Sequence, residues 1–181
     1  MTMAMKKCLV LMTFAASLLL CACGGGGGGG GSGGALGAAA TVTPSNLQTG
    51  QSAPEIAAQS WVNTTEKPAL SDLKGRSAVL MFSRSNCSYC TGSLPRMAEL
   101  YGQATNTLFM TLTHEDASVS ATYLAEHPEI VWPYGSSSDT YTAYGVDGVP
   151  HFFLVSSAAV ILWEGHTADE LGTQLTLYGL R

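Results

Sequence analysis

The tetrapeptide Cys87-Ser88-Tyr89-Cys90 is the part of this sequence best suited to chemistry. Two cysteines at this spacing can form a disulfide and exchange it with other thiols, because a thiolate attacks a disulfide sulfur. The same spacing occurs in structural zinc sites, but these need four ligands, and the sequence has no second cysteine pair after residue 54. We therefore expect a redox-active disulfide Cys87–Cys90, no other cofactor and no metal site. Metal handling and an inert structural disulfide are the alternatives.

A strand and a helix must position this pair. Residues 77–83 (SAVLMFS) are a short apolar run that predicts a buried central strand, and residues 90–103 carry apolar side chains at helical spacing. The cysteines thus lie where a strand ends and a helix begins, where the helix dipole favours a thiolate. We expect Cys87, nearer the helix start, to be the attacking nucleophile. Cys90, one turn further and more buried, is expected to resolve the mixed disulfide.

The rest of the sequence alternates strand-like and helix-like segments. Strands are expected at residues 107–113, 151–155 and 160–164, and helices at residues 117–126, 139–144 and 167–177. In the last helix, we expect Leu171, Leu175 and Leu177 to point inward. The order of the longer elements, β-α-β-α-β-β-α, predicts an α/β sheet with helices on both faces.

Together these residues resemble the TlpA/ResA-like branch of the thioredoxin superfamily. The resemblance rests on residues 70–76 (LSDLKGR), on the Cys-Ser-Tyr-Cys segment, on Gly148-Val149-Pro150 with HFFLV, and on Ala53-Pro54-Glu55. It implies a thioredoxin-like fold over residues 54–181, with a central mixed β-sheet flanked by helices on both faces. It also implies a thiol:disulfide oxidoreductase that acts as a reductant, for example in cytochrome c maturation.

The resemblance gives Val149 and Pro150 a role in substrate binding. The matching proline of the superfamily is cis and lies beside the active-site disulfide. Proline has no N–H to donate, so the backbone of Val149 is left to pair with an extended substrate strand. The alternative is an ordinary trans proline in a turn before a strand.

Three residues depart from the family pattern. Asn86 stands where family members commonly have Trp, Met81 where many thioredoxins have an acidic residue, and Ser93 where some members carry Glu. No buried carboxylate is therefore in place to relay the proton of the resolving cysteine. His151 is an auxiliary candidate because histidine titrates near neutral pH; otherwise it is a partly exposed residue without a mechanistic role. Tyr89 is the other auxiliary candidate, since the dipeptide between the cysteines tunes the reduction potential.

The first 53 residues have the composition of a targeting segment and a tether. Basic residues followed by the apolar run Leu9–Leu20 predict a cleaved signal peptide over residues 1–22, because a membrane-spanning helix needs about 20 apolar residues. Leu20-Cys21-Ala22-Cys23 resembles a lipobox, so Cys23 is expected to be lipidated; cleavage without lipid is the alternative. Residues 23–53, rich in Gly, Ala and Ser, predict a flexible linker to the folded domain at residues 54–181.

Charge and targeting restrict the partners. Without Lys6 and Lys7, the eight Lys and Arg residues fall to six, against thirteen Asp and Glu. This balance lacks the basic field that nucleic acid binding requires. We expect protein thiols and disulfides as substrates, a membrane redox partner, a monomer, and a location on the periplasmic side of the bacterial cell envelope, anchored to the membrane by lipid.

Two other functions remain to be separated from this one. A copper-binding lipoprotein could use Cys87, Cys90 and a histidine as ligands for Cu(I). A peroxidase could share the fold, but residues 82–86 (FSRSN) lack the proline that precedes the reactive cysteine of peroxiredoxins.

Overall fold

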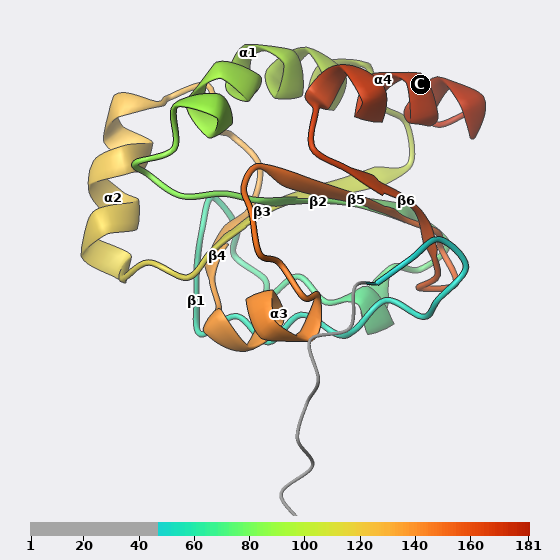
Figure 1. Ribbon diagram of the computed structural model, residues 1–181, viewed down its shortest axis with the longest axis horizontal. Helices are drawn as coiled ribbons and strands as arrows, with labels where there is room; N and C mark the ends of the chain where they lie inside the picture. Colours follow the sequence, from blue (N-terminus) through green and yellow to red (C-terminus); the bar gives the residue numbers. More distant parts are fainter. Residues whose placement is uncertain (1–46) are drawn as a thin grey trace, which may run out of the picture. The chain divides into compact units, whose positions relative to one another are not determined.

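A mixed sheet of six strands lies at the centre of the structure, a computed structural model that describes residues 47–181 (Figure 1). The strand order is β1-β4-β3-β2-β5-β6, with β2 parallel to β3 and antiparallel to β5. The strands are β1 Ser60–Val62, β2 Ser77–Phe82, β3 Thr107–Thr113, β4 Tyr134–Ser136, β5 His151–Val155 and β6 Ile161–Gly165. The expected signal peptide, the lipidated Cys23 and the linker up to residue 46 lie outside the described residues.

Helices cover both faces of this sheet. They are α1 Ser88–Gln103, α2 Ala117–Glu126, α3 Ser138–Ala143 and α4 Ala168–Leu177, and a 3-10 turn η1 spans Leu70–Asp72. Figure 1 shows α1 and α4 side by side on one face and α3 on the other. The predicted α/β sheet with helices on both faces is therefore confirmed. Within residues 47–181, no helix is long and apolar enough to cross a membrane.

The central strand β2 divides the core in two. All six of its residues are buried, and they alternate between the two faces of the sheet. Val79 and Met81 pack in the apolar cluster beneath α1 and α4. Leu80 and Phe82 belong to the cluster that includes Tyr141 of α3. A strand covered on both faces needs a continuous apolar run, which explains why this strand can be recognised in the sequence.

Two strands and one side chain differ from the sequence prediction. The strands β1 and β4 have three residues each, which is too short for a recognisable alternation of apolar and polar side chains. In α4, Leu171 and Leu175 are fully buried, but Leu177 is 74% exposed, so its predicted inward position is wrong. Two residues along a helix rotate a side chain by about 200°, which turns Leu177 away from the face of Leu175.

The segment before Pro54 joins the edge of the sheet. Gly50 N–H donates to the Ile161 carbonyl at 2.8 Å, and Ala53 N–H donates to the Ala159 carbonyl at 2.8 Å. Residues 50–53, which the sequence assigned to the linker, thus pair with residues 159–161, at the turn before β6 and the start of this edge strand.

Candidate redox site

The cysteine pair lies at the N-terminus of α1, directly after the loop that follows β2. Cys87 caps the helix: its backbone is extended, and its Sγ accepts a hydrogen bond from the Cys90 N–H at 3.1 Å. The two cysteines form a disulfide, with their Cα atoms 5.2 Å apart. The first turn of α1 holds no acidic side chain, so nothing there opposes the positive end of the helix dipole. This position favours negative charge on the sulfur of Cys87.

The two sulfurs differ in burial. Cys90 is fully buried in the apolar cluster that contains Met81 and Leu94, whereas Cys87 is only half-buried. The Met81 side chain occupies the interior position at which many thioredoxins have a carboxylate, and it is itself fully buried. An incoming disulfide can therefore reach Cys87 more readily than Cys90.

Val149 and Pro150 lie beside this pair. The Val149–Pro150 peptide bond is cis, and the Val149 carbonyl oxygen lies 3.5 Å from Cys87 Sγ. Pro150 is buried, while Val149 is partly exposed. The structure thus brings together Cys87, Cys90 and the dipeptide that the sequence assigned to substrate binding. Tyr89, the auxiliary candidate between the cysteines, is 80% exposed and points away from the core.

His151 does not lie with the sulfurs. Its ring stacks on Phe153 with centroids 4.5 Å apart, and its Nε2 lies 2.7 Å from a carboxylate oxygen of Glu164. Phe153 faces the cluster around Phe82, on the opposite side of the sheet from Cys90. Burial lowers the pKa of His151, and the hydrogen bond to Glu164 opposes that effect. The structure therefore gives no contact through which His151 could relay a proton to the cysteines.

A carboxylate that the sequence analysis did not single out holds the loop before Cys87. Both the backbone N–H and the hydroxyl of Ser85 donate to the Glu115 carboxylate, at 2.8 and 2.7 Å. Thr113 at the end of β3 donates to the same group at 3.1 Å. The signal in the sequence was weak, because an acidic residue before a helix is also a common helix start.

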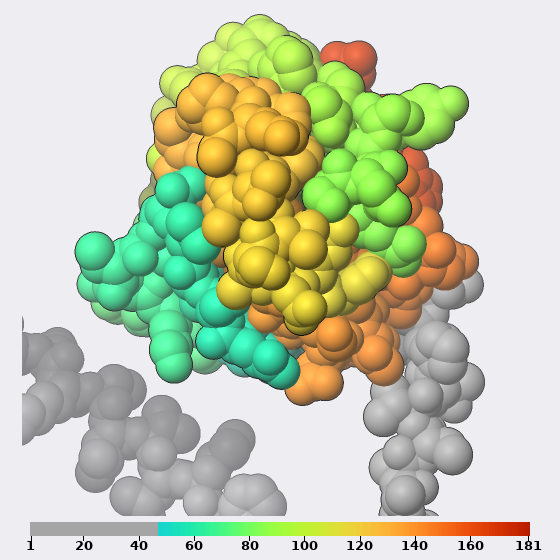
Figure 2. Space-filling view, turned by 90° about the vertical axis from the view of Figure 1, so that its left-hand side faces the viewer, coloured from blue at the N-terminus to red at the C-terminus, as the bar shows by residue number. Residues whose placement is uncertain are grey.

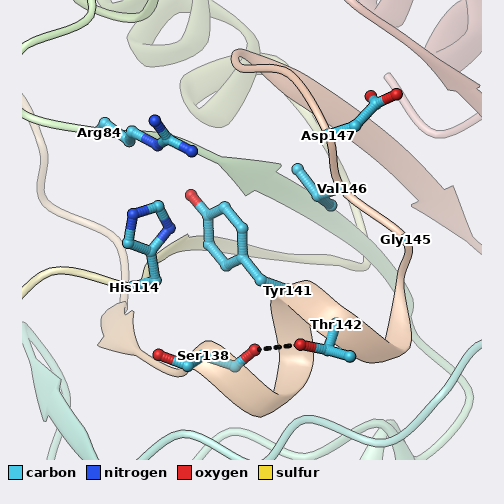
Figure 3. Close-up of a pocket in the computed structure, with 8 residues that line it drawn as sticks. All are labelled: Arg84, His114, Ser138, Tyr141, Thr142, Gly145, Val146 and Asp147. Atoms are coloured by element: carbon cyan, nitrogen blue, oxygen red, sulfur yellow. Dashed lines mark hydrogen bonds between the residues drawn. The ribbon is translucent and has the colours of Figure 1, made fainter. Parts of the chain in front are cut away.

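Two cavities flank this loop. The larger, of about 400 Å³, lies between Arg84 and His114 on one side and the loop of residues 145–147 on the other, with Tyr141 between them (Figure 3). The smaller, of about 360 Å³, separates Asn86 from α2 and is lined by Val119 and Thr122. Figure 2 shows α2 (yellow) at the surface next to the green segment that begins α1.

The chain matches a sequence model described as the AhpC/TSA family over residues 49–163. No curated protein matches it significantly.

Several solved structures of similar fold align with this chain over nearly their whole length. The thioredoxin domain of a thiol-disulfide oxidoreductase from Bacteroides vulgatus is 20% identical, with a TM-score of 0.66 over 75% of this chain and 99% of that chain. A protein from Chlorobium tepidum described as thiol:disulfide interchange protein DsbE is 26% identical, with a TM-score of 0.61 over 75% and 99%. AhpC from Mycobacterium bovis is 13% identical, with a TM-score of 0.60 over 74% and 98%. These likenesses show the thioredoxin-like fold.

Proposed function

We propose a function for this chain on one premise: it belongs to the AhpC/TSA family of thioredoxin-like oxidoreductases. The proposed function is the exchange of disulfides with protein substrates in the bacterial cell envelope. One observation carries the proposal. Cys87 is half-buried at the N-terminus of α1, and its Sγ accepts a hydrogen bond from the Cys90 N–H at 3.1 Å. Cys90 itself is fully buried. This geometry supports a nucleophile and a resolving thiol in one motif.

The reaction proceeds in two exchanges. In the reduced protein, the Cys87 thiolate attacks one sulfur of a substrate disulfide, forms a mixed disulfide and releases the other substrate sulfur as a thiolate. The Cys90 thiolate then attacks Cys87, which releases the second substrate thiol and closes the Cys87–Cys90 disulfide. Two electrons pass to the substrate, and the two protons needed for its thiols come from Cys87, Cys90 or water.

The surroundings of Cys87 suit an extended peptide. The backbone of Val149 lies within reach of a strand that approaches the sulfur, as in β-strand addition. The two cavities that flank the loop before Cys87, one lined by Arg84 and the other by Asn86, can receive substrate side chains. We propose no cofactor beyond the Cys87–Cys90 disulfide.

The direction we propose is reduction. The TlpA/ResA-like resemblance favours a reductant, for example in cytochrome c maturation. The similarity to the Chlorobium tepidum protein, described as a thiol:disulfide interchange protein, supports disulfide exchange in either direction. A membrane redox partner then returns electrons to the Cys87–Cys90 disulfide. Lipid on Cys23 and the Gly-rich segment after it would keep the domain, as a monomer, close to that partner.

The reduction potential of the Cys87–Cys90 couple tests this direction. A glutathione or thioredoxin redox titration of the purified protein should give a potential nearer to about −270 mV, the value of thioredoxin, than to about −120 mV, the value of the oxidant DsbA. A potential near the oxidising end would contradict the reductant role.

An activity assay tests the proposed function itself. The reduced protein should reduce a disulfide-containing protein, and Cys87→Ser should abolish that reduction while Cys23→Ser, a control outside the described domain, leaves it intact. If the wild-type protein shows no exchange but binds Cu(I) through Cys87 and Cys90, the copper-binding alternative replaces the redox function.

A further inference from the structure

Two histidines and a glutamate meet where β5 begins and β6 ends. In the antiparallel register of these strands, Phe153 pairs with Glu164, and continuing that register places His151 opposite His166. Side chains two residues apart on a strand share a face of the sheet. His151 and Glu164 therefore share the face opposite to Cys90, and His166, directly after β6, lies against His151.

The three side chains are close enough to share one ion. One ligand atom from each lies within 4.8 Å of the other two, and the two imidazole centroids are 4.4 Å apart. A zinc ion binds nitrogen and oxygen at about 2.0–2.2 Å, so neighbouring ligand atoms in a tetrahedral site are about 3.4 Å apart. The contact of 2.7 Å between His151 and Glu164 is shorter than this separation, so metal binding requires these two side chains to move apart.

The hydrogen bond of His166 prepares one of its nitrogens for a metal. Its Nδ1 lies 2.8 Å from the Pro150 carbonyl oxygen, which can only accept, so Nδ1 carries the hydrogen. The Nε2 lone pair is then free. Metal-binding histidines commonly donate their second N–H to a backbone carbonyl in this way, which fixes both tautomer and ring orientation.

A cavity of about 300 Å³ opens over the three groups. Its lining includes His151, Glu164 and His166, and also Asp147 from the loop before β5. His151 is buried, Glu164 is half-buried and His166 is exposed. The cavity therefore has room for an ion with a water molecule, and Asp147 offers a further carboxylate at its rim.

From this arrangement we infer that His151, Glu164 and His166 form a binding site for a divalent transition-metal ion of the Zn²⁺ type. Two imidazoles and one carboxylate suit zinc, nickel or copper, whereas Mg²⁺ and Ca²⁺ prefer oxygen ligands throughout. The site uses neither Cys87 nor Cys90, so it is separate from the disulfide and independent of the proposed exchange reaction.

Titration of the purified full-length chain with ZnCl₂ tests the site. The Cys87–Cys90 disulfide is kept oxidised and any other cysteine thiol that the purified protein retains is alkylated, so that no cysteine can bind the ion. Isothermal calorimetry and competition with a chromophoric chelator should show one Zn²⁺ per chain that excess Mg²⁺ does not displace.

Two variants and a control locate the ion. Glu164→Gln and His166→Gln should each weaken binding by tenfold or more, since even partners outside the coordination sphere are worth about 10–100-fold. His127→Gln is the matched control, because His127 also contacts a carboxylate, Glu129 at 3.2 Å, but the cluster of three ligands does not include this pair. Its Zn²⁺ affinity should equal that of the wild type.

Nuclear magnetic resonance of the wild-type protein gives a readout that needs no variant. Zn²⁺ should shift the imidazole signals of His151 and His166 and leave those of His114 and His127 unchanged. Absence of Zn²⁺ binding overturns the inference and leaves His151–Glu164 as an ion pair. Binding that is unaffected in both folded variants, or signals that shift only at other histidines, overturns it as well.

Discussion

At the scale of single residues, burial assigns the two cysteines different roles. Cys87 is half-buried and can meet a partner protein, while Cys90 is fully buried beneath it. A mixed disulfide on Cys87 is normally short-lived because Cys90 attacks it from within the same turn of helix. We therefore expect the rate of attack by Cys90 to set the lifetime of that intermediate.

Replacing the buried cysteine should trap partner proteins. In Cys90→Ala, Cys87 can attack a substrate disulfide but no thiol resolves the product, so adducts on Cys87 should accumulate and appear on non-reducing gels. They should disappear when a reductant is added. If Cys87→Ala accumulates the adducts instead, the roles of the two cysteines are reversed.

Glu55 shows how one carboxylate can hold a local structure. Its side chain accepts hydrogen bonds from the backbone N–H of Leu70 and Ser71, at 2.6 and 2.8 Å, at the start of η1, and from Ile56 at 2.9 Å. Burial alone would raise the pKa of Glu55, but these hydrogen bonds outweigh it and lower the pKa. The Ala53-Pro54-Glu55 motif, recognised in the sequence only by resemblance, thus joins two segments 15 residues apart.

The lowered pKa of Glu55 predicts a loss of stability in acid. A carboxyl whose pKa is lower in the folded state stabilises the fold above its unfolded pKa, near 4.5, and this contribution is lost as the pH falls through the folded value. In Glu55→Gln the chemical denaturation midpoint should be lower at pH 7 and should change less between pH 6 and 3 than in the wild type. Glu126→Gln, an exposed glutamate of α2, should retain the wild-type dependence. Equal slopes for Glu55→Gln and the wild type would contradict this role.

At the scale of elements, α4 shows which part of its apolar pattern stabilises the fold. Leu175 is fully buried against the sheet, whereas Leu177 is 74% exposed. Leu175→Ala should lower the free energy of unfolding by about 2–5 kcal/mol through lost contacts and a cavity. Leu177→Ala should change it by less than about 0.5 kcal/mol. Urea denaturation of both variants measures the difference, and similar losses would mean that Leu177 packs in the core after all.

The elements that could be predicted from the sequence are those with a strong local pattern. The strand of residues 77–83 is covered on both faces and is therefore apolar throughout, and the cysteine motif marks the start of α1. By contrast, β1 is stabilised by pairing with β4, and β4 also pairs with β3, which no local pattern reveals. The gathering of His151 with Glu164 and His166 depends on the register of two strands joined by a turn, and that register is not encoded in the spacing of the three residues.

At the scale of the whole molecule, the start of β5 joins the two sites. Val149 places its carbonyl near Cys87, the Pro150 carbonyl accepts from His166, and His151 contacts Glu164. Three consecutive residues thus contact both sites: Val149 lies next to the disulfide, and Pro150 and His151 contact His166 and Glu164.

The attachment of the domain to a membrane is a prediction for the chain as a whole, and it depends on Cys23, which lies outside the described residues. If Leu20-Cys21-Ala22-Cys23 is a lipobox, Cys23 carries the lipid. The apolar run Leu9–Leu20 is too short to anchor the protein as a membrane-spanning helix, since spanning takes about 20 residues. Cys23→Ser should therefore lose incorporation of labelled fatty acid and move from the membrane fraction to the soluble fraction. Cys87→Ser, the same exchange within the domain, should keep both the label and the membrane location. Labelling of Cys23→Ser, or its unchanged retention in the membrane fraction, would refute the lipid anchor and leave ordinary cleavage of the signal peptide as the alternative.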